Sequence, residues 1–243
     1  MKLELIGTGN TAQVYNWEEN KVLKLFYEGY PTSAVEKEYT NALLVKEMDF
    51  SKPIVYEIIM YEGRQGIIYE KISGETLLDW FFKTGDLDNC ALYMSVLHKR
   101  LLKLQQNNLP GYKEFLEYHI RNSGKLETLE KEKVLCILKG LPEGNTLCHG
   151  DFYPGNILMC GTENYVIDFM NLCKGNYLYD IARTVYLVGY TPVSEEEPNR
   201  EYILNAKRIL TETYLSYMGV TLETIRDYLT VIKAARGSEC PNE

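Results

Sequence analysis

The sequence lacks the features that mark membrane, secreted and nucleic-acid-binding proteins. No uncharged apolar run reaches the roughly 18 residues that a membrane span needs, and Met1–Asn10 is too short and too mixed for a signal peptide. The formal net charge is −8, and no stretch is rich in lysine and arginine. We therefore expect no membrane and no nucleic-acid partner, and the acidic balance favours a cationic or metal-bound ligand.

Histidines and paired cysteines are scarce as well. The six cysteines form no C-x2-C pair, and the three histidines complete no zinc-binding spacing. Isolated cysteines without a secretory signal are typical of a reducing compartment, so we expect a cytoplasmic protein whose cysteines serve as small buried residues. The sequence leaves the oligomeric state open.

The chain has enough apolar residues for a core, because 45% of its 243 residues are hydrophobic and 25% are charged. This length suits one large domain or two small lobes. The first third is rich in strand signals, with one helix expected over Ala34–Met48 after a helix-start signal at Pro31. The five expected strands are Leu3–Gly9, Ala12–Trp17, Lys21–Phe26, Ile54–Tyr61 and Gly66–Ile72.

Helical patterns dominate after Gly74, with a short strand pair expected at Asn156–Cys160 and Tyr165–Phe169. The sequence therefore predicts an α+β fold, with a small five-stranded lobe over residues 1–72 and a larger, mainly helical lobe over residues 73–243. The expected helices are Leu92–Gln106, Lys113–Ile120, Leu126–Leu138, Leu178–Val188, Glu201–Met218 and Leu222–Ala235. One face of Glu201–Met218 carries a stripe that we expect to be buried, made of Ile203, Ala206, Leu210, Tyr214 and Tyr217.

The strongest chemical signal is the segment His149–Asn156, which reads H-G-D-F-Y-P-G-N. Phosphoryl transfer needs a carboxylate that orients the attacking hydroxyl and a neutral oxygen ligand for Mg²⁺, and the kinase motif H-R-D-x-x-x-x-N spaces them five residues apart. Asp151 and Asn156 have this spacing, so Asp151 is the candidate catalytic base. Taken alone, the segment also suits a turn capped by an Asp.

A second carboxylate, Asp168, ends the apolar strand that follows the expected hairpin. From there it can reach back toward Asn156, and two oxygen ligands from two strand ends suit Mg²⁺. Asp168-Phe169 stands where protein kinases carry D-F-G, with Met170 in place of the glycine. The alternative is an Asp that only caps the next turn.

A glycine-rich turn joins the first two expected strands, at Gly7, Gly9, Asn10 and Thr11. Such a turn lets backbone N–H groups approach phosphates without obstruction by a Cβ atom. It follows the template G-x-G-x-x-G-x-V with Ala12 at the third glycine. No helix is expected after it, which argues against a dinucleotide fingerprint or a Walker loop.

Lys24 lies in the middle of the apolar strand Lys21–Phe26, where a lysine is costly unless it is paired. The kinase lysine pairs with nucleotide phosphates and with a glutamate on the following helix. That helix offers Glu36 and Glu38, and we choose Glu38 because it shares a face with Val35 and Ala42. The alternative is a solvent-facing lysine on an edge strand.

Four segments, taken in order, resemble the aminoglycoside phosphotransferase and choline kinase-like family. They are Ser73-Gly74, His149–Asn156, Ile167-Asp168-Phe169 and Tyr179-Asp180-Ile181-Ala182, and the resemblance runs from about residue 3 to residue 236. It implies a bilobal, protein-kinase-like fold and transfer of the γ-phosphate of ATP, with Mg²⁺, to a hydroxyl of a small molecule.

By position, the resemblance makes Asp151 the base, Asn156 and Asp168 the Mg²⁺ ligands, and Lys24 with Glu38 the phosphate-positioning pair. Three further expectations concern other residues. The backbone of Glu70 and Ile72 would bind adenine, His98 and His149 would be structural, and Asp180 would brace the catalytic loop.

The acceptor is expected to be a small hydroxylated molecule, cationic if the acidic cluster Glu195–Glu197 attracts it. Certain aminoglycoside enzymes carry acidic residues in their last helix, whereas Ile232–Arg236 is apolar and basic here. Aminoglycosides, choline or ethanolamine, amino-acid hydroxyls and sugars all stay open. The other classes considered are a non-catalytic nucleotide-binding protein, and a protein kinase, against which the short segment between Asp168 and Asp180 argues.

Overall fold

The structure is a computed structural model that describes residues 3–240. The chain divides into two compact units, which are treated separately below. The first unit comprises Met1–Leu77 and Gly155–Asn171, and the second comprises Leu78–Pro154 and Leu172–Glu243. The assignment of nucleotide and acceptor roles to lobes 1–72 and 73–243 stays a prediction.

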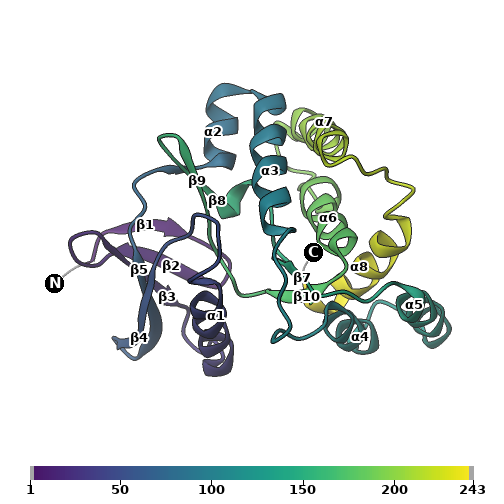
Figure 1. The fold of residues 1–243 in the computed structure, drawn as a ribbon, viewed down its shortest axis with the longest axis horizontal. Coiled ribbons are helices and arrows are strands. Elements are labelled where there is room, and N and C mark those ends of the chain that lie inside the picture. The colour runs from purple at the N-terminus through teal and green to yellow at the C-terminus, as the bar shows by residue number, and fades with distance from the viewer. Residues whose placement is uncertain (1–2, 241–243) are drawn as a thin grey trace. The chain divides into compact units, whose positions relative to one another are not determined.

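The first unit is built on a five-stranded antiparallel sheet in the order β1-β2-β3-β5-β4 (Figure 1). On one face of β3, Leu23 and Leu25 pack with Ile68 in a core, as expected for alternating side chains of a strand. The strands are β1 (Leu5–Thr8), β2 (Ala12–Asn16), β3 (Lys21–Phe26), β4 (Val55–Tyr61) and β5 (Arg64–Glu70).

Helix α1 (Thr32–Val45) packs against β4 and β5. Its buried residues recur every three or four positions, which makes one face of the helix a continuous stripe. Two of them, Glu38 and Asn41, are polar, so this helix brings hydrogen-bonding groups into the interior of the unit. The buried stripe consists of Val35, Glu38, Asn41, Ala42 and Val45.

Residues 155–171 join the first unit as a hairpin of β8 (Ile157–Cys160) and β9 (Glu163–Val166). The short strand β6 (Glu75–Thr76) pairs with β8 to complete a three-stranded sheet, and the 3-10 turn η1 (Pro154–Asn156) precedes it. The Val166 N–H donates to the Ser51 carbonyl at 2.9 Å, which ties the hairpin to the segment after α1. A distant part of the sequence thereby becomes part of the strand-rich unit.

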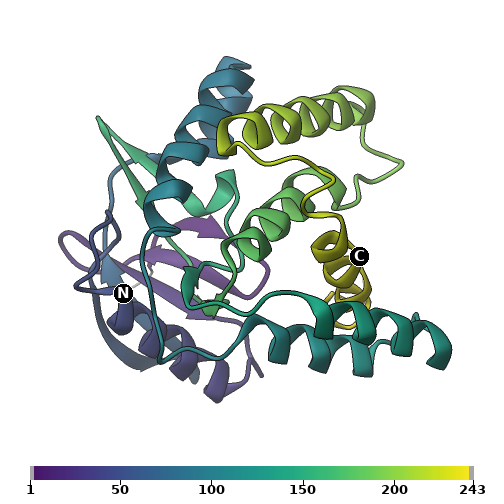
Figure 2. The same ribbon diagram turned by 45° about the vertical axis from the view of Figure 1, so that its right-hand side comes forward.

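The second unit is mainly helical, with α3 packed on α7 and α4 packed on α8 (Figure 2). A two-stranded sheet of β7 (Thr146–Cys148) and β10 (Cys173–Gly175) lies within it. Its helices are α2 (Leu77–Thr84), α3 (Leu87–Leu101), α4 (Tyr112–Asn122), α5 (Thr128–Gly140), α6 (Tyr177–Val185), η2 (Tyr186–Tyr190), α7 (Arg200–Met218) and α8 (Arg226–Glu239).

The predicted α+β class and its five-stranded antiparallel sheet are confirmed. Short apolar strands were expected from Thr146 onward, and β7 begins there. Helix α2 and the short strands β6 and β10 were not expected. Helix α3 begins at Leu87 because Asp86 caps it by accepting from the Asn89 N–H at 3.0 Å. The predicted stripe on α7 is buried at Ala206, Leu210 and Tyr214 and half-buried at its two ends.

The six cysteines carry free thiols. Cys90, Cys148 and Cys173 are buried as expected, whereas Cys136 is exposed on α5. Among the described residues, no helix is both long enough and apolar enough to cross a membrane.

Gly74 is required where the chain passes close to β8. A Cβ atom at this position would lie 2.0 Å from the carbonyl oxygen of Met159, a backbone atom that cannot turn aside. We predict that Gly74→Ala lowers the free energy of unfolding by about 2 kcal/mol, measured by denaturant titration. The matched control is Gly124→Ala, where the added methyl group would meet nothing within 4 Å. Equal losses in the two variants would contradict this account.

Candidate functional site

The charged centre of the first unit is a cluster of Lys24, Glu38 and Asp168. The Lys24 Nζ lies 2.7 Å from a Glu38 carboxylate oxygen and 3.2 Å from the Asp168 Oδ1. The Tyr69 hydroxyl donates to the same Glu38 oxygen at 3.0 Å. Lys24 therefore does not face solvent on an edge strand, since β3 lies inside the sheet and the side chain is 15% exposed.

Burial and charge act in opposite directions within this cluster. Burial lowers the pKa of Lys24, but the carboxylates of Asp168 and Glu38 outweigh it, so the pKa of Lys24 lies above its ordinary value. Burial raises the pKa of Glu38, and the nearby Lys24 opposes that shift only in part. Lys24 is therefore firmly cationic, and Asp168 is the more accessible of its two counter-ions, at 33% exposure.

The position of Asp168 depends on the segment that follows it. Its backbone is in the left-handed region, with φ of +67°, which turns the chain sharply after β9. The buried Asn41 donates to the Phe169 carbonyl at 2.7 Å, and the Phe169 ring packs edge-on against Phe50. These contacts with α1 and the segment after it hold the turn. The position of Asp168 therefore depends on residues more than 100 positions earlier in the sequence.

Asn156 lies at the start of the same hairpin and is buried, at 6% exposure. Its carbonyl accepts from the Ile167 N–H at 3.1 Å, which places Asn156 beside the residue that precedes Asp168. A carboxylate and an amide oxygen from the two ends of one hairpin are ligands of the kind Mg²⁺ takes when waters and phosphates supply its other ligands. The residues present therefore fit this ion. Within residues 3–240, no group of three or more His, Cys, Asp or Glu side chains forms a metal site of its own.

The glycine-rich turn between β1 and β2 is anchored to the end of β3. The Tyr27 N–H donates to the Thr11 carbonyl at 3.0 Å, and the Tyr27 hydroxyl donates to the Gly9 carbonyl at 2.9 Å. Neither Gly7 nor Gly9 has a positive φ, and a Cβ atom on Gly7 would make only ordinary contact with Val14. The turn itself therefore does not need these glycines, and their predicted role toward phosphates stays a prediction, as does that of Asn10.

The predicted adenine-binding segment, Glu70 to Ile72, begins at the last residue of β5. The Glu70 N–H donates to the Ile54 carbonyl at 2.8 Å, and the Ile54 N–H donates to the Glu70 carboxylate at 3.1 Å. Ile72 comes two residues after the strand and is half-buried. The Glu70 N–H already donates to a backbone carbonyl of the first unit. A hydrogen bond from this segment to adenine would therefore have to come from other backbone groups.

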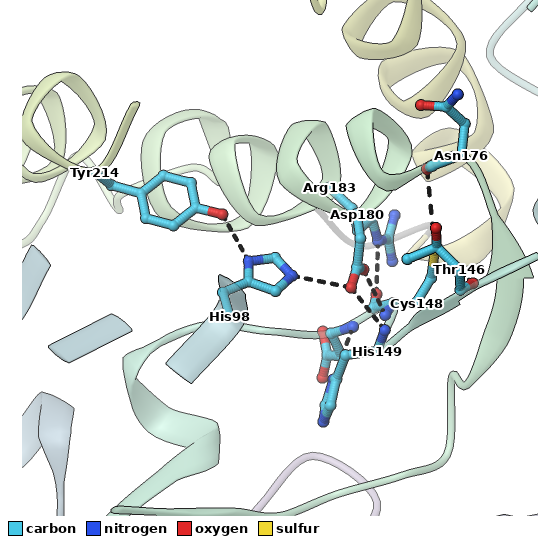
Figure 3. A network of polar contacts seen from close by, with 10 residues as sticks. His98, Thr146, Cys148, His149, Asn176, Asp180, Arg183 and Tyr214 are labelled. Carbon is cyan, nitrogen blue, oxygen red and sulfur yellow. Dashed lines mark hydrogen bonds and ion pairs between the residues drawn. The ribbon is translucent and has the colours of Figure 1, made fainter. Parts of the chain in front are cut away.

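In the second unit, the buried Asp180 of α6 holds the loop that carries Asp151 (Figure 3). One Asp180 oxygen accepts from the His149 N–H at 2.7 Å, and the other accepts from the Gly150 N–H at 2.8 Å. Gly150 has φ of +76°, a conformation that suits glycine. Asp180 therefore braces the loop through its backbone, as the sequence predicted.

His98 completes the surroundings of Asp180. Its Nε2 lies 3.0 Å from the Asp180 carboxylate and its Nδ1 lies 2.6 Å from the Tyr214 hydroxyl (Figure 3). Because a carboxylate can only accept, the Nε2 donates the proton. Burial raises the pKa of Asp180, but the hydrogen bonds and charge of His98, with His149 and the Gly150 N–H, bring it below the ordinary value. The structural role predicted for His98 matches this geometry.

Arg183, one turn further along α6, adds a second contact to the loop. Its Nε donates to the Gly150 carbonyl at 3.0 Å, and its two terminal nitrogens bind the two carboxylate oxygens of Glu239 near the end of α8. Arg236 pairs with the same carboxylate at 3.0 Å. The last helix is thereby linked through buried ion pairs to the residue that precedes Asp151.

The predicted site residues thus fall into two groups. The first unit contains all the candidate nucleotide and metal residues, and it brings Lys24, Glu38 and Asp168 into direct contact. Asp151 belongs to the second unit. Four further residues make hydrogen bonds in these groups and were not predicted from the sequence: Asn41, Tyr69, Arg183 and Glu239. Spacing could have found two of them, because Asn41 lies three residues after Glu38 and Arg183 lies three residues after Asp180.

Residues 2–206 match the model of the phosphotransferase enzyme family, APH. The chain belongs to this family. No curated protein matches the chain.

Solved structures share the fold at low sequence identity. A thermostable mutant of aminoglycoside phosphotransferase APH(4)-Ia superposes with a TM-score of 0.66 at 15% identity, covering 100% of this chain and 89% of the other. Amicoumacin kinase hAmiN, solved with AMP-PNP and Ca²⁺, has a TM-score of 0.60 at 19% identity, covering 98% and 80%. Aminoglycoside phosphotransferase APH(3'')-Id from Streptomyces rimosus, with ADP and streptomycin, has a TM-score of 0.57 at 15% identity, covering 96% and 92%. The predicted kinase-like α+β fold is therefore confirmed.

The link between Arg183 and Glu239 yields a prediction for stability. Burial raises the pKa of Glu239, but Arg183 and Arg236 outweigh it, so the pKa lies below its ordinary value. Its ionised form therefore stabilises the fold above about pH 4.3, and this contribution is lost as the pH falls through the lowered pKa. We predict that Glu239→Gln lowers the free energy of unfolding by about 3 kcal/mol at pH 7, with a smaller loss below about pH 4.

Denaturant titrations at a series of pH values measure this difference. The matched control is Glu212→Gln, which removes an exposed partner of Arg208 on α7 and should cost no more than about 0.5 kcal/mol. A loss for Glu239→Gln that did not change with pH would show that ionisation is not its source.

Proposed function

We propose that this protein is a small-molecule kinase, which transfers the γ-phosphate of ATP to a hydroxyl group of a small acceptor. The observation that carries the proposal is the position of Lys24 between the carboxylates of Glu38 and Asp168. A lysine paired with a glutamate and facing a metal-binding aspartate is the arrangement that positions nucleotide phosphates in kinases. Membership of the phosphotransferase family supports the same reaction class.

The first unit supplies the nucleotide-binding groups in this proposal. Lys24 binds the phosphates, and Glu38 holds the ammonium group in place. The backbone of the turn at Gly7, Gly9, Asn10 and Thr11 covers the phosphates, and the segment at Glu70 and Ile72 receives the adenine. The presence of AMP-PNP and of ADP in structures with the same fold supports a nucleotide ligand for this unit.

Asp168 and Asn156 would hold Mg²⁺, which neutralises charge on the phosphates when it is bound. The protein's own part is to present the oxygen atoms. Asn41 and the Phe50 ring fix the turn after Asp168, and the hydrogen bond from Ile167 fixes the backbone of Asn156. Lys24 also pairs with the Asp168 carboxylate, so its ammonium group balances part of the negative charge of Asp168.

Asp151 accepts the proton of the acceptor hydroxyl as that oxygen attacks the γ-phosphorus, and ADP leaves with the electrons of the broken P–O bond. The brace around its loop supports this role. Asp180 accepts from the backbone N–H groups of His149 and Gly150, Arg183 donates to the Gly150 carbonyl, and the Asp151 N–H donates to the His149 ring at 3.2 Å. A base held in this way can keep the acceptor oxygen in line with the phosphorus.

The acceptor predicted from the sequence is a small hydroxylated molecule, cationic if Glu195–Glu197 attract it. These three residues lie in the mostly exposed connection between η2 and α7, and this part of the proposal still rests on charge alone. The activity is tested by ADP release from Mg²⁺ and ATP with a panel of aminoglycosides, amino alcohols, sugars and nucleosides. Release of ADP with none of them would contradict the proposed kinase.

The first prediction concerns the base. Asp151→Asn should lower kcat at least about 100-fold while nucleotide affinity is retained, because Asp151 acts on the acceptor. Steady-state ADP release and nucleotide titration measure the two effects. The control is Asp227→Asn, which changes an exposed Asp on α8 and should leave both unchanged. A fall in kcat of less than about tenfold would remove Asp151 from the role of base.

The second prediction concerns the metal ligands. Asp168→Ala should weaken Mg²⁺-dependent nucleotide binding more than Asn156→Ala does, because a carboxylate contributes a charge that an amide lacks. Titration of each variant with AMP-PNP, with and without Mg²⁺, separates the metal-dependent part. Equal affinity of the wild type and Asp168→Ala in Mg²⁺ would contradict the assignment.

A further inference from the structure

A pocket of about 320 Å³ opens in the second unit beside the carboxyl-terminal half of α8. Its wall is completed by the connection between α4 and α5, by the start of η2 and by Pro192. The residues that matter below are Ser123, Lys125, Tyr186, Lys233, Arg236 and Gly237. The volume is near the lower limit for ligand pockets, which suits an open-chain or single-ring molecule.

The lining of this pocket is basic, although the whole chain is acidic. Lys125, Lys233 and Arg236 line it, and no Asp or Glu is among its lining residues. Behind the wall, Glu239 is shared by Arg236 and Arg183. Three cations therefore line this pocket on a chain whose net charge is −8. Such a reversal of sign favours an anionic ligand.

Among the three cations that line the pocket, Arg236 is the most firmly held. It is buried at 9% exposure, pairs with Glu239 at 3.0 Å, and lies over the Tyr186 ring at 5.8 Å from its centroid. A guanidinium held by a carboxylate and an aromatic ring keeps its planar set of donors in a fixed orientation, which suits carboxylate and phosphate groups. Lys125 and Lys233 are exposed, so they can add charge at the mouth.

The shape of the pocket depends on the close packing of Ser123 and Lys125 against the backbone of α8 at Gly237. A Cβ atom on Gly237 would lie 2.8 Å from the Ser123 Oγ and 3.4 Å from the Lys125 Cβ. Glycine at this position lets α8 approach the connection between α4 and α5. Lys125 is thereby brought to the same pocket as Lys233 and Arg236.

The pocket is also connected to the loop that carries Asp151. Tyr186, the first residue of η2, comes three residues after Arg183 of α6, and Arg183 donates to the Gly150 carbonyl. Glu239 binds Arg183 and Arg236 together. One set of buried ion pairs therefore holds both the wall of the pocket and the residue before the base.

We propose that this pocket binds an anionic group, a carboxylate or a phosphate, of the small molecule whose hydroxyl is phosphorylated. The assignment rests on the proposed kinase function and names its acceptor class. It gives the acceptor the opposite charge to that expected from Glu195–Glu197. Lys125 and Lys233 determine specificity for the charge of the acceptor, and Arg236 positions its anionic group.

The first test measures binding without turnover. Inorganic phosphate and gluconate are titrated against the protein saturated with AMP-PNP and Mg²⁺, by calorimetry, with glucosamine as the cationic counterpart of gluconate. We expect phosphate and gluconate to bind, and the double variant Lys125→Gln/Lys233→Gln to weaken both about fivefold. The control is Lys99→Gln, which changes an exposed lysine on α3 outside the pocket. Equal weakening in the control, or no difference between the variants, would overturn the site.

The second test separates this inference from the kinase function. ADP release is measured with one sugar framework in four forms: glucose, glucosamine, gluconate and glucose 6-phosphate. We expect an anionic form to be the best acceptor, and the double lysine variant to raise its KM about fivefold with kcat unchanged, the pattern of lost ground-state binding. One contrary result is ADP release with glucosamine alone, with a KM for glucosamine that rises when Glu195–Glu197 are changed to glutamine. That result would overturn the anionic acceptor and leave the proposed kinase activity standing. Lysine-dependent binding of gluconate without ADP release from any form would keep the anion site and overturn the kinase.

Discussion

The organisation of the second unit depends on one buried carboxylate. Asp180 is fully buried and accepts from two consecutive backbone N–H groups and from His98. An ionised group in such a place costs several kcal/mol unless donors surround it, and here they do. Because those donors include the backbone of His149 and Gly150, satisfying the charge also fixes the loop that ends at Asp151. The position of the candidate base thus follows from an electrostatic requirement of the interior.

The first unit uses the same physical principle with the opposite charge. Lys24 is placed inside a sheet, where burial opposes its positive charge, and Glu38 and Asp168 compensate it. Glu38 is in turn held by Tyr69. In both units a buried charge is stable only when its partners are in place. Folding therefore already puts the charged residues of the candidate site in the arrangement proposed for the chemistry.

The last helix, α8, connects two parts of the second unit through Glu239. Glu239 binds two arginines, one of which contacts the loop that carries Asp151 while the other lines the basic pocket. A change in this helix would therefore affect the loop through Arg183 and the pocket through Arg236. This coupling links α8 both to the loop of the candidate base and to the basic pocket, although the helix itself supplies no candidate base or nucleotide ligand.

The sequence by itself determined the class of fold and singled out the candidate site residues, because alternating strands, helical stripes and the spacing of Asp151, Asn156 and Asp168 are local patterns. Local patterns also chose Glu38 over Glu36, since only one of them shares the buried face of α1. Only the tertiary structure decided that residues 155–171 join the strand-rich unit, that Asn41 holds the turn after Asp168, and that Glu239 reaches Arg183. Each of these depends on contacts between segments far apart in the chain, where partners are selected by packing and by the need to satisfy buried polar groups.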